Sequence, residues 1–433
     1  MDSKRIIRTY IAIASLYTLS ASLIWGVNTL FLLSAGLDIF GTFVANAVFT
    51  AAMVIFEVPT GVVADTAGRR ASFLLSTAVL CLATLGYVGV SLVGGGLFWF
   101  CVMSVFLGIG FTFYSGAVEA WLVDALKTTD YDGDLDPIFA RAGIITSALM
   151  LVGTIGGGFL GNINLAYPYV VRAILLAIVF GWAYLYMHEI GYTPRALTRA
   201  SIPAEMRKVA RESITYGWHN RPVRLIMITT LFHGLYSIWG FYATQPYFLD
   251  LLGQPDAVWV SGVVAALVSL TGIIGGWLVA RFMRRFRFRT TILIATAAVY
   301  TAATIGVGLA SSFWLAVGLF LLGSLVVSIF TPVKQSYIHQ IIPSAQRATV
   351  ISFDSMMSSA GGVVGQTGLG YLSREQGLAT GFVAGGIATM LALPFLVALR
   401  GTGEKADQIK SNQELPPTPL PVQGIAEDGS PLP

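Results

Sequence analysis

The chain has 433 residues, of which 55% are hydrophobic and only 11% are charged, and its mean hydropathy is +0.74. A soluble protein carries about 25% charged residues, so most of this surface faces something other than water. The net charge of +4 does not indicate nucleic-acid binding, because Lys and Arg stand in short loops between apolar runs. Cys81 and Cys101 lie apart in apolar runs and predict neither a metal site nor a disulfide framework.

Twelve apolar segments are long enough to cross a bilayer as helices. They cover residues 9–34, 39–63, 71–93, 97–126, 138–163, 167–190, 223–250, 256–282, 290–310, 313–338, 347–372 and 378–400. We therefore predict an all-α integral membrane protein with twelve transmembrane helices. The first segment is too long for a signal-peptide core and has no clear cleavage site, so we expect a retained first helix.

Basic residues predict the orientation of these helices. With the N-terminus inside, Lys and Arg gather in the cytoplasmic segments, whereas the outer loops hold only Arg374. Both termini are therefore expected in the cytoplasm. In the polar connection at 191–222, apolar and basic residues alternate at helical spacing after Pro203, which is typical of a helix on the inner membrane surface. Residues 401–433 are polar and Pro-rich, and a disordered cytoplasmic tail is expected there.

The turn between the second and third segments carries the motif G-V-V-A-D-T-A-G-R-R, which begins at Gly61. Gly61 and Gly68 permit a sharp reversal, and Asp65 can accept hydrogen bonds from N–H groups at a helix start. Arg69 and Arg70 favour the cytoplasmic side. The motif resembles the loop signature of the major facilitator superfamily, G-x-x-x-D-x-x-G-R-[RK]. In that family the loop latches the two halves of a transporter together on the cytoplasmic side. A basic turn between two membrane helices is the alternative interpretation.

An internal repeat extends the resemblance over nearly the whole chain. The turn after the eighth segment, G-G-W-L-V-A-R-F-M-R-R, aligns Arg284 and Arg285 with Arg69 and Arg70 but lacks the carboxylate. Two six-helix halves in parallel repeat are the architecture of the superfamily. The resemblance thus implies a six-helix bundle at 1–190, a cytoplasmic connecting loop at 191–222, a second six-helix bundle at 223–400 and the tail at 401–433.

The resemblance also implies a cytoplasmic gate in which Asp65 lies at the start of the eleventh helix. Asp124 and Arg141 stand near the inner ends of the fourth and fifth helices, where they can join a charge cluster with the motif. Arg347 begins the eleventh helix. The predicted gate residues are Gly61, Asp65, Gly68, Arg69, Arg70, Asp124, Arg141 and Arg347.

Ionisable groups inside membrane helices are costly and are therefore functional candidates. A carboxyl group that loses its water favours the protonated form and can exchange protons near neutral pH. Glu119 is the first candidate for proton coupling, because no basic residue lies one turn away on its own helix. Glu57 and Asp354 follow, and each of the three can instead serve a structural contact. Arg172, near the outer end of the sixth helix, is a further intramembrane charge.

Aromatic and polar side chains within the predicted helices suggest a substrate cavity, because helices 1, 4, 7 and 10 line the central cavity in the superfamily. The candidates are Tyr17, Trp25, Asn28, Tyr114, Trp121, His233, Tyr236, Trp239, Gln245, Lys334 and Gln335. An aromatic cavity with few charges favours large solutes that are apolar or weakly cationic. For His233, a packed histidine is the alternative.

The glycine-rich run G-T-I-G-G-G-F-L-G at 153–161 resembles the antiporter signature of the superfamily's drug exporters, G-x-x-x-G-P-x-x-G. Gly158 stands where that signature has proline, and a small-residue packing face is the alternative. The resemblance to this drug/proton antiporter-like branch implies a secondary active transporter of the cell membrane. Its expected function is proton-coupled export of small amphipathic compounds by alternating access. A proton-coupled uptake symporter of the same fold and a membrane sensor without net transport are the alternatives.

The chemistry of an enzyme is not predicted. The sequence shows no nucleophile–base pair, phosphate loop or metal-ligand spacing, so neither a cofactor nor a metal is expected. The expected partners are the lipid bilayer, a small-molecule substrate and protons, without nucleic acid, and the protein is expected to be a monomer.

Overall fold

The computed structural model describes residues 2–129, 131, 133–192, 203–204, 206–207, 211, 213–343 and 346–409. These residues form helices joined by short turns, with one isolated β-bridge between Phe288 and Gln408. Within the predicted connection at 191–222, a short π-helix, η2 (Ser213–Trp218), precedes the second half. Most of the predicted surface helix in that connection, and the tail beyond residue 409, lie outside the described residues.

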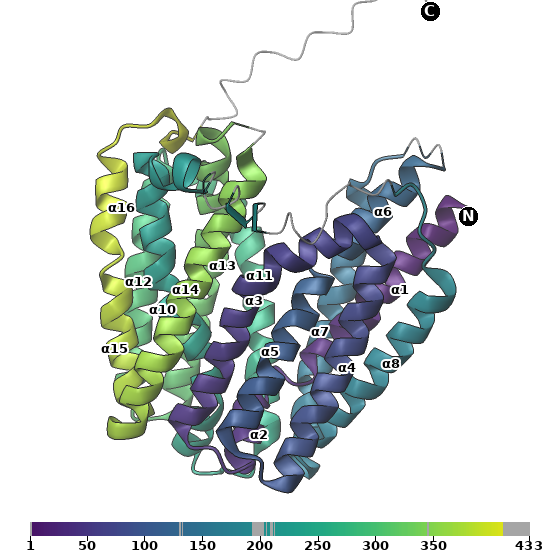
Figure 1. Cartoon of the computed structure of the whole chain (residues 1–433). Helices are drawn as coiled ribbons and strands as arrows, with labels where there is room; N and C mark the ends of the chain where they lie inside the picture. The colour runs from purple at the N-terminus through teal and green to yellow at the C-terminus, as the bar shows by residue number, and fades with distance from the viewer. Residues whose placement is uncertain are drawn as a thin grey trace, which may run out of the picture.

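The two halves occupy opposite sides of the molecule (Figure 1). The first half contains α1 (Ser3–Ser22), α2 (Asn28–Ser34), α3 (Ile39–Ala67), α4 (Arg69–Val93), α5 (Gly96–Tyr114), α6 (Ala117–Lys127), α7 (Asp136–Ile163) and α8 (Tyr167–Tyr186). The second half contains α10 (Arg221–Leu252), α11 (Val258–Arg285), α12 (Arg289–Leu309), α13 (Phe313–Ile341), α14 (Arg347–Gln376), α15 (Leu378–Met390) and α16 (Leu393–Arg400). Helices thus occupy all twelve predicted segments.

Three of the predicted segments are broken rather than continuous. The first is divided into α1 and α2 by a turn at 23–27. The fourth is divided into α5 and α6 at Ser115 and Gly116, where Gly116 has a φ of +71° that favours glycine. The twelfth is divided into α15 and α16 at 391–392, and Pro394 is tolerated in the first turn of α16 because the N–H it lacks would be unpaired there.

In the described residues, ten helical spans are each long and apolar enough to cross a membrane. The first predicted segment is not among these spans: α1 has 20 residues but is less apolar, with Lys4, Arg5 and Arg8 in its first two turns. The eleventh, α14, has 30 residues but is more polar, with Asp354 and Gln366 in its interior. Both side chains hydrogen-bond to neighbouring helices, so the polarity of α14 is buried between helices rather than turned to lipid.

The halves pack together at one end of the bundle and diverge toward the other (Figure 1). We call the end where α1 begins the basic end, because the Gly68–Arg70 turn lies there, and the other the opposite end. Near the opposite end, α3 packs against α14 and α7 against α11. A Cβ atom added to Gly158 of α7 would lie 2.9 Å from the Cα atom of Gly262 in α11, so these backbones touch only because both residues are glycine.

Residues 401–409 fold back onto the second half, so the predicted disordered tail is wrong for this stretch. Its short helix η4 (Lys405–Asp407) places the buried Asp407 carboxylate at the first turn of α12. This carboxylate accepts hydrogen bonds from the Thr290 N–H at 2.7 Å and the Thr290 hydroxyl at 2.8 Å. Asp407 thereby satisfies an N–H that has no partner within the helix.

Candidate functional site

A cavity of about 420 Å³ lies between the two halves. Its walls come from α1 to α5 and α8 of the first half and from α10 and α11 of the second. Tyr17, Trp25 and Asn28, three of the predicted cavity residues, line it. Aromatic side chains from both halves, including Phe241 and Tyr242, make most of the remaining wall apolar. An apolar cavity with a few polar groups is the usual form of a small-molecule site.

A short chain of polar side chains crosses one wall of this cavity. The Tyr169 hydroxyl donates to Asn28 Oδ1 at 2.8 Å, and Asn28 Nδ2 donates to Asn46 Oδ1 at 2.9 Å. The Nδ2 atom of Asn46 is buried without a partner. Arg172 of α8 also lines the cavity and is the only charged residue among the described lining residues. Few charges were predicted in the cavity, and the structure adds this cation.

Gln245 closes the cavity toward the opposite end. From α10 it accepts a hydrogen bond from the Thr29 N–H at 2.8 Å and donates to the Trp25 carbonyl, also at 2.8 Å. The Thr29 hydroxyl donates to the Tyr242 carbonyl at 2.9 Å. The turn at 23–27 exposes the backbone groups that these bonds use. Gln245 was predicted as a cavity residue, and in this conformation it joins the two halves.

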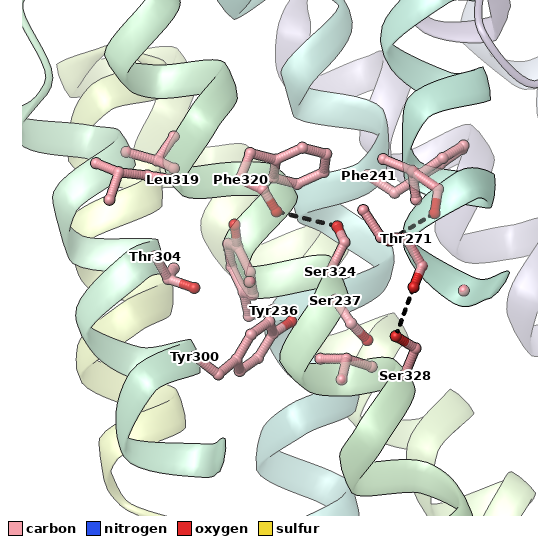
Figure 2. Close-up of a pocket in the computed structure, with 15 residues that line it drawn as sticks. Tyr236, Ser237, Phe241, Thr271, Tyr300, Thr304, Leu319, Phe320, Ser324 and Ser328 are labelled. Atoms are coloured by element: carbon pink, nitrogen blue, oxygen red, sulfur yellow. Dashed lines mark hydrogen bonds between the residues drawn. The ribbon is translucent and has the colours of Figure 1, made fainter. Parts of the chain in front are cut away.

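A second cavity of about 290 Å³ lies within the second half, among α10, α11, α12 and α13 (Figure 2). The predicted Tyr236 lines it. Ser324 donates to the Phe320 carbonyl at 3.0 Å and Ser328 to the Thr271 carbonyl at 3.1 Å (Figure 2). These hydroxyls are therefore already paired, and no charged side chain appears among the described residues that line the cavity. We regard the cavity between the halves as the candidate site.

Several predicted cavity residues lie elsewhere. Trp121 is fully buried, and its Nε1 donates to the His188 carbonyl at 2.7 Å. Trp239 is fully buried against Phe43 of the other half, with ring centroids 5.6 Å apart. Tyr114 stacks on Tyr17 with ring centroids 3.7 Å apart.

Two further candidates on α10 and α13 also lie outside the described cavities. The ring of His233 lies between Tyr300 and Phe330, at centroid distances of 5.2 and 4.8 Å. Its Nε2 is buried without a partner. The Gln335 side chain on α13 is exposed.

A buried ion pair joins three helices of the second half. Lys334 Nζ of α13 lies 2.6 Å from Asp354 Oδ2 of α14. The Thr230 hydroxyl of α10 donates to Asp354 Oδ1 at 2.7 Å and accepts from Lys334 Nζ at 3.0 Å. Each charge is therefore compensated, which is the condition under which charges are tolerated inside a membrane bundle. Asp354 and Lys334 were predicted for separate roles, and the structure brings them together.

The motif turn is held within the first half. Gly68 has a φ of +104° and separates α3 from α4, and Arg69 pairs with Asp65 at 2.9 Å. The Arg70 N–H donates to Glu189 Oε2 at 2.9 Å. Burial raises the pKa of the Tyr192 hydroxyl beside this turn, and the nearby carboxylates of Asp65 and Glu189 raise it further.

The other gate and coupling candidates lie near the basic end. Arg141 and Arg347 are exposed, and Asp124 is partly buried. Glu57 is exposed, and its Oε1 accepts a hydrogen bond from Ser115 at 3.5 Å. Gly61 is also exposed.

Glu119 stands in the first turn of α6 and is exposed. Glu119 was predicted to be an isolated carboxylate within the membrane, and in this conformation its side chain is exposed rather than buried. Its location after the Gly116 break puts the negative charge at the positive end of a helix dipole.

Four polar residues around these sites were not predicted for them. Arg172 was noted as an intramembrane charge, but its depth and direction are not readable from hydropathy. Asn46, Thr230 and Glu189 carry no distinctive spacing in the sequence. In the described residues, no group of three or more His, Cys, Asp or Glu side chains could hold a metal ion.

Residues 10–304 and 287–426 match the Major Facilitator Superfamily. The chain belongs to the major facilitator superfamily. A relative within the superfamily is the uncharacterized MFS-type transporter YxaM of Bacillus subtilis (strain 168). It is 21% identical over 376 residues, which cover 85% of this chain and 89% of YxaM. The protein is thus a membrane transporter rather than an enzyme, as predicted.

Solved structures of the superfamily have the same fold. The nucleoside transporter NupG superposes with a TM-score of 0.74 at 10% identity, covering 91% of this chain and 99% of NupG. A POT family transporter in complex with 5-aminolevulinic acid superposes with a TM-score of 0.71 at 12% identity, covering 92% of this chain and 96% of that one. These likenesses confirm the predicted fold class, and at such identities they concern the fold alone.

Proposed function

We propose that this transporter is a proton-coupled exporter of small amphipathic compounds that works by alternating access. The observation that carries the proposal is the cavity shared by both halves and closed at the opposite end through Gln245. With the predicted orientation, the basic end is cytoplasmic and this conformation receives its substrate from the cytoplasm. The mostly apolar and aromatic wall favours amphipathic solutes.

The buried pair of Lys334 and Asp354 supports proton coupling. A proton on Asp354 would remove the attraction that holds Lys334, so protonation would change how α13 and α14 pack. The geometry favours Asp354 over Glu119 for this role, because Asp354 is largely buried beside a cation whereas Glu119 is exposed. Glu57 and Glu119 stay as further candidates.

The first test is a susceptibility screen in cells that lack their major pumps, using a panel of amphipathic antibiotics and dyes. Expression of the protein should raise resistance to some compounds. A compound found this way is then measured in everted membrane vesicles with an acidic lumen. An exporter should accumulate it in these vesicles, and a protonophore should abolish the accumulation.

Variants assign the coupling residue. Asp354→Asn should abolish accumulation driven by the pH gradient, whereas Asp250→Asn, a change at an exposed position of α10, should leave it intact. Accumulation only in right-side-out vesicles with an acidic exterior would replace the proposal with the uptake symporter. Intact protein that carries none of the compounds in either vesicle type would favour the sensor.

A further inference from the structure

Arg172 is a buried cation without a partner. Its residue is 8% exposed, and its Nε atom is buried with no hydrogen-bond partner. Among the described residues, no hydrogen bond or ion pair involves its guanidinium group. An unpaired charge in such a place is costly, and Arg has five N–H donors that are suited to a carboxylate or a similar anion.

The described surroundings of Arg172 contain neutral tyrosine hydroxyls and no negative charge. None of the described residues that line the cavity is Asp or Glu. Asn46 Nδ2 is a second unpaired donor in the same wall, because Asn46 Oδ1 already accepts from Asn28. Two unsatisfied donors in one cavity select a ligand that brings acceptor atoms, and the positive charge selects an anion over a cation.

We propose that the cavity between the halves binds amphipathic anions, with the anionic group held by Arg172 and Asn46. The apolar body of the solute contacts Trp25, Phe241 and Tyr242, which come from both halves. The inference rests on the proposed transport function for its biological meaning, but the binding site can be tested separately. It replaces the expectation of weakly cationic solutes, which considered only the aromatic side chains.

The site is divided between the halves, so its two parts move relative to each other during alternating access. Arg172 of α8 and Asn46 of α3 belong to the first half, so the anionic group stays with that half as the halves move. Phe241 and Tyr242 belong to α10 of the second half, so their contacts with the solute are the ones that alternating access rearranges, whereas Trp25 stays with the first half. Gln245, one turn from Phe241, forms the closure at the opposite end.

The experiment compares three ligands that share one aromatic body: 2-naphthylacetate, its neutral amide 2-naphthylacetamide, and the cation 2-(2-naphthyl)ethylammonium. Binding to the purified full-length protein in lipid nanodiscs is measured by calorimetry. We expect the carboxylate to bind about 10- to 100-fold more tightly than the amide, the range for hydrogen bonds to a charged group. The ammonium ligand should bind most weakly.

Variants identify the residue responsible. Arg172→Gln should lower the affinity for 2-naphthylacetate to that for the amide and leave the affinity for the amide unchanged. Arg172→Lys, which keeps the charge without the planar fork, should give an intermediate value. Arg285→Gln removes a positive charge from an exposed position in the last turn of α11 and should change nothing. Because Arg172 has no partner, its removal should not lower the melting temperature, which verifies that the variant is folded.

The outcomes separate the two proposals. Equal affinities for the three ligands, tightest binding of the ammonium ligand, or unchanged carboxylate binding by Arg172→Gln would each overturn the anion site. Arg172-dependent binding of the carboxylate without any flux in vesicles would support the site and count against the exporter. Proton-driven flux of cations that is indifferent to Arg172 would support the exporter and overturn the anion site.

Discussion

Gln245 is the side chain whose removal should most directly change which end of the cavity is open. It is 4% exposed, and its amide makes two hydrogen bonds of 2.8 Å to backbone groups of the other half. Both bonds must break when the opposite end opens. Gln245→Ala therefore removes stabilisation from the present conformation and not from the one with the opposite end open.

The magnitude follows from those two bonds. A hydrogen bond within a protein contributes about 0.5–1.5 kcal/mol net, so two contribute about 1–3 kcal/mol. Because every 1.4 kcal/mol is a factor of ten, the equilibrium should shift toward opening at the opposite end by roughly 5- to 150-fold. Other bonds between the halves, such as those from Thr29 to the Tyr242 carbonyl and from Gln366 to Thr50, keep the closure from being lost entirely.

The shift can be measured with spin labels at Val93 and Ser311, which are exposed near the opposite end, one in each half. Cys81 and Cys101 are first replaced by serine. In nanodiscs, Gln245→Ala should increase the population of molecules in which the labels at Val93 and Ser311 are far apart. The matched control is Gln340→Ala, which removes an exposed amide on α13 and should leave the distances unchanged. Identical distance distributions for Gln245→Ala and the unsubstituted protein, with normal melting, would refute the reasoning.

Three further changes test the packing and charge contacts. Asp354→Asn leaves Lys334 buried without its counter-charge and should lower the free energy of unfolding by up to about 3–5 kcal/mol in thermal or denaturant melts. Asp407→Ala should cost about 0.5–2 kcal/mol, as for loss of a helix cap, and speed amide exchange in residues 405–409. Gly157→Val drives a side chain into the Leu23 carbonyl and should lower stability by at least about 1–3 kcal/mol.

Each of these three substitutions has a control that separates its effect from a general loss of stability. For the ion pair, the double change Lys334→Met with Asp354→Leu should recover most of the loss, and no recovery would mean that the pair is not the cause. Asp407 is matched by the partly buried Glu404, whose change to Ala should leave exchange unaltered. Gly157 is matched by Gly156, where an added Cβ meets nothing within 4 Å. Equal melting of Gly157→Val and Gly156→Val would contradict the close packing of α1 and α7.

The fold was largely predictable because hydropathy and the internal repeat both act over whole helices. A segment of about twenty apolar residues has few alternatives to a membrane helix. The breaks were not predictable in the same way, because an apolar run says nothing about the φ of Gly116. The ordered stretch at 401–409 was missed because a polar, exposed composition hides one capping carboxylate, Asp407.

Only part of the candidate site was predicted, because aromatic residues that line a cavity and aromatic residues that pack in a core occur in similar apolar runs. Trp25 lines the cavity, whereas Trp121 and Trp239 are buried among helices. All three stand in apolar runs, so the sequence cannot tell a cavity wall from a core. Arg172 was visible as an intramembrane charge, but its meaning depends on which side chains surround it. That arrangement comes from helices far apart in the sequence.

The two charged sites together imply a charge balance for the transport cycle. Arg172 of the first half has a buried Nε without a partner, whereas Lys334 of the second half is paired with Asp354. Under the two proposals, export of a monoanion in exchange for one proton moves two positive charge equivalents into the cell. At about 2.3 kcal/mol per charge per 100 mV, an inside-negative potential of 100 mV contributes roughly 4.6 kcal/mol to each such cycle. The unpaired cation thus makes the substrate's own charge a source of driving force, which a neutral or cationic solute would not supply.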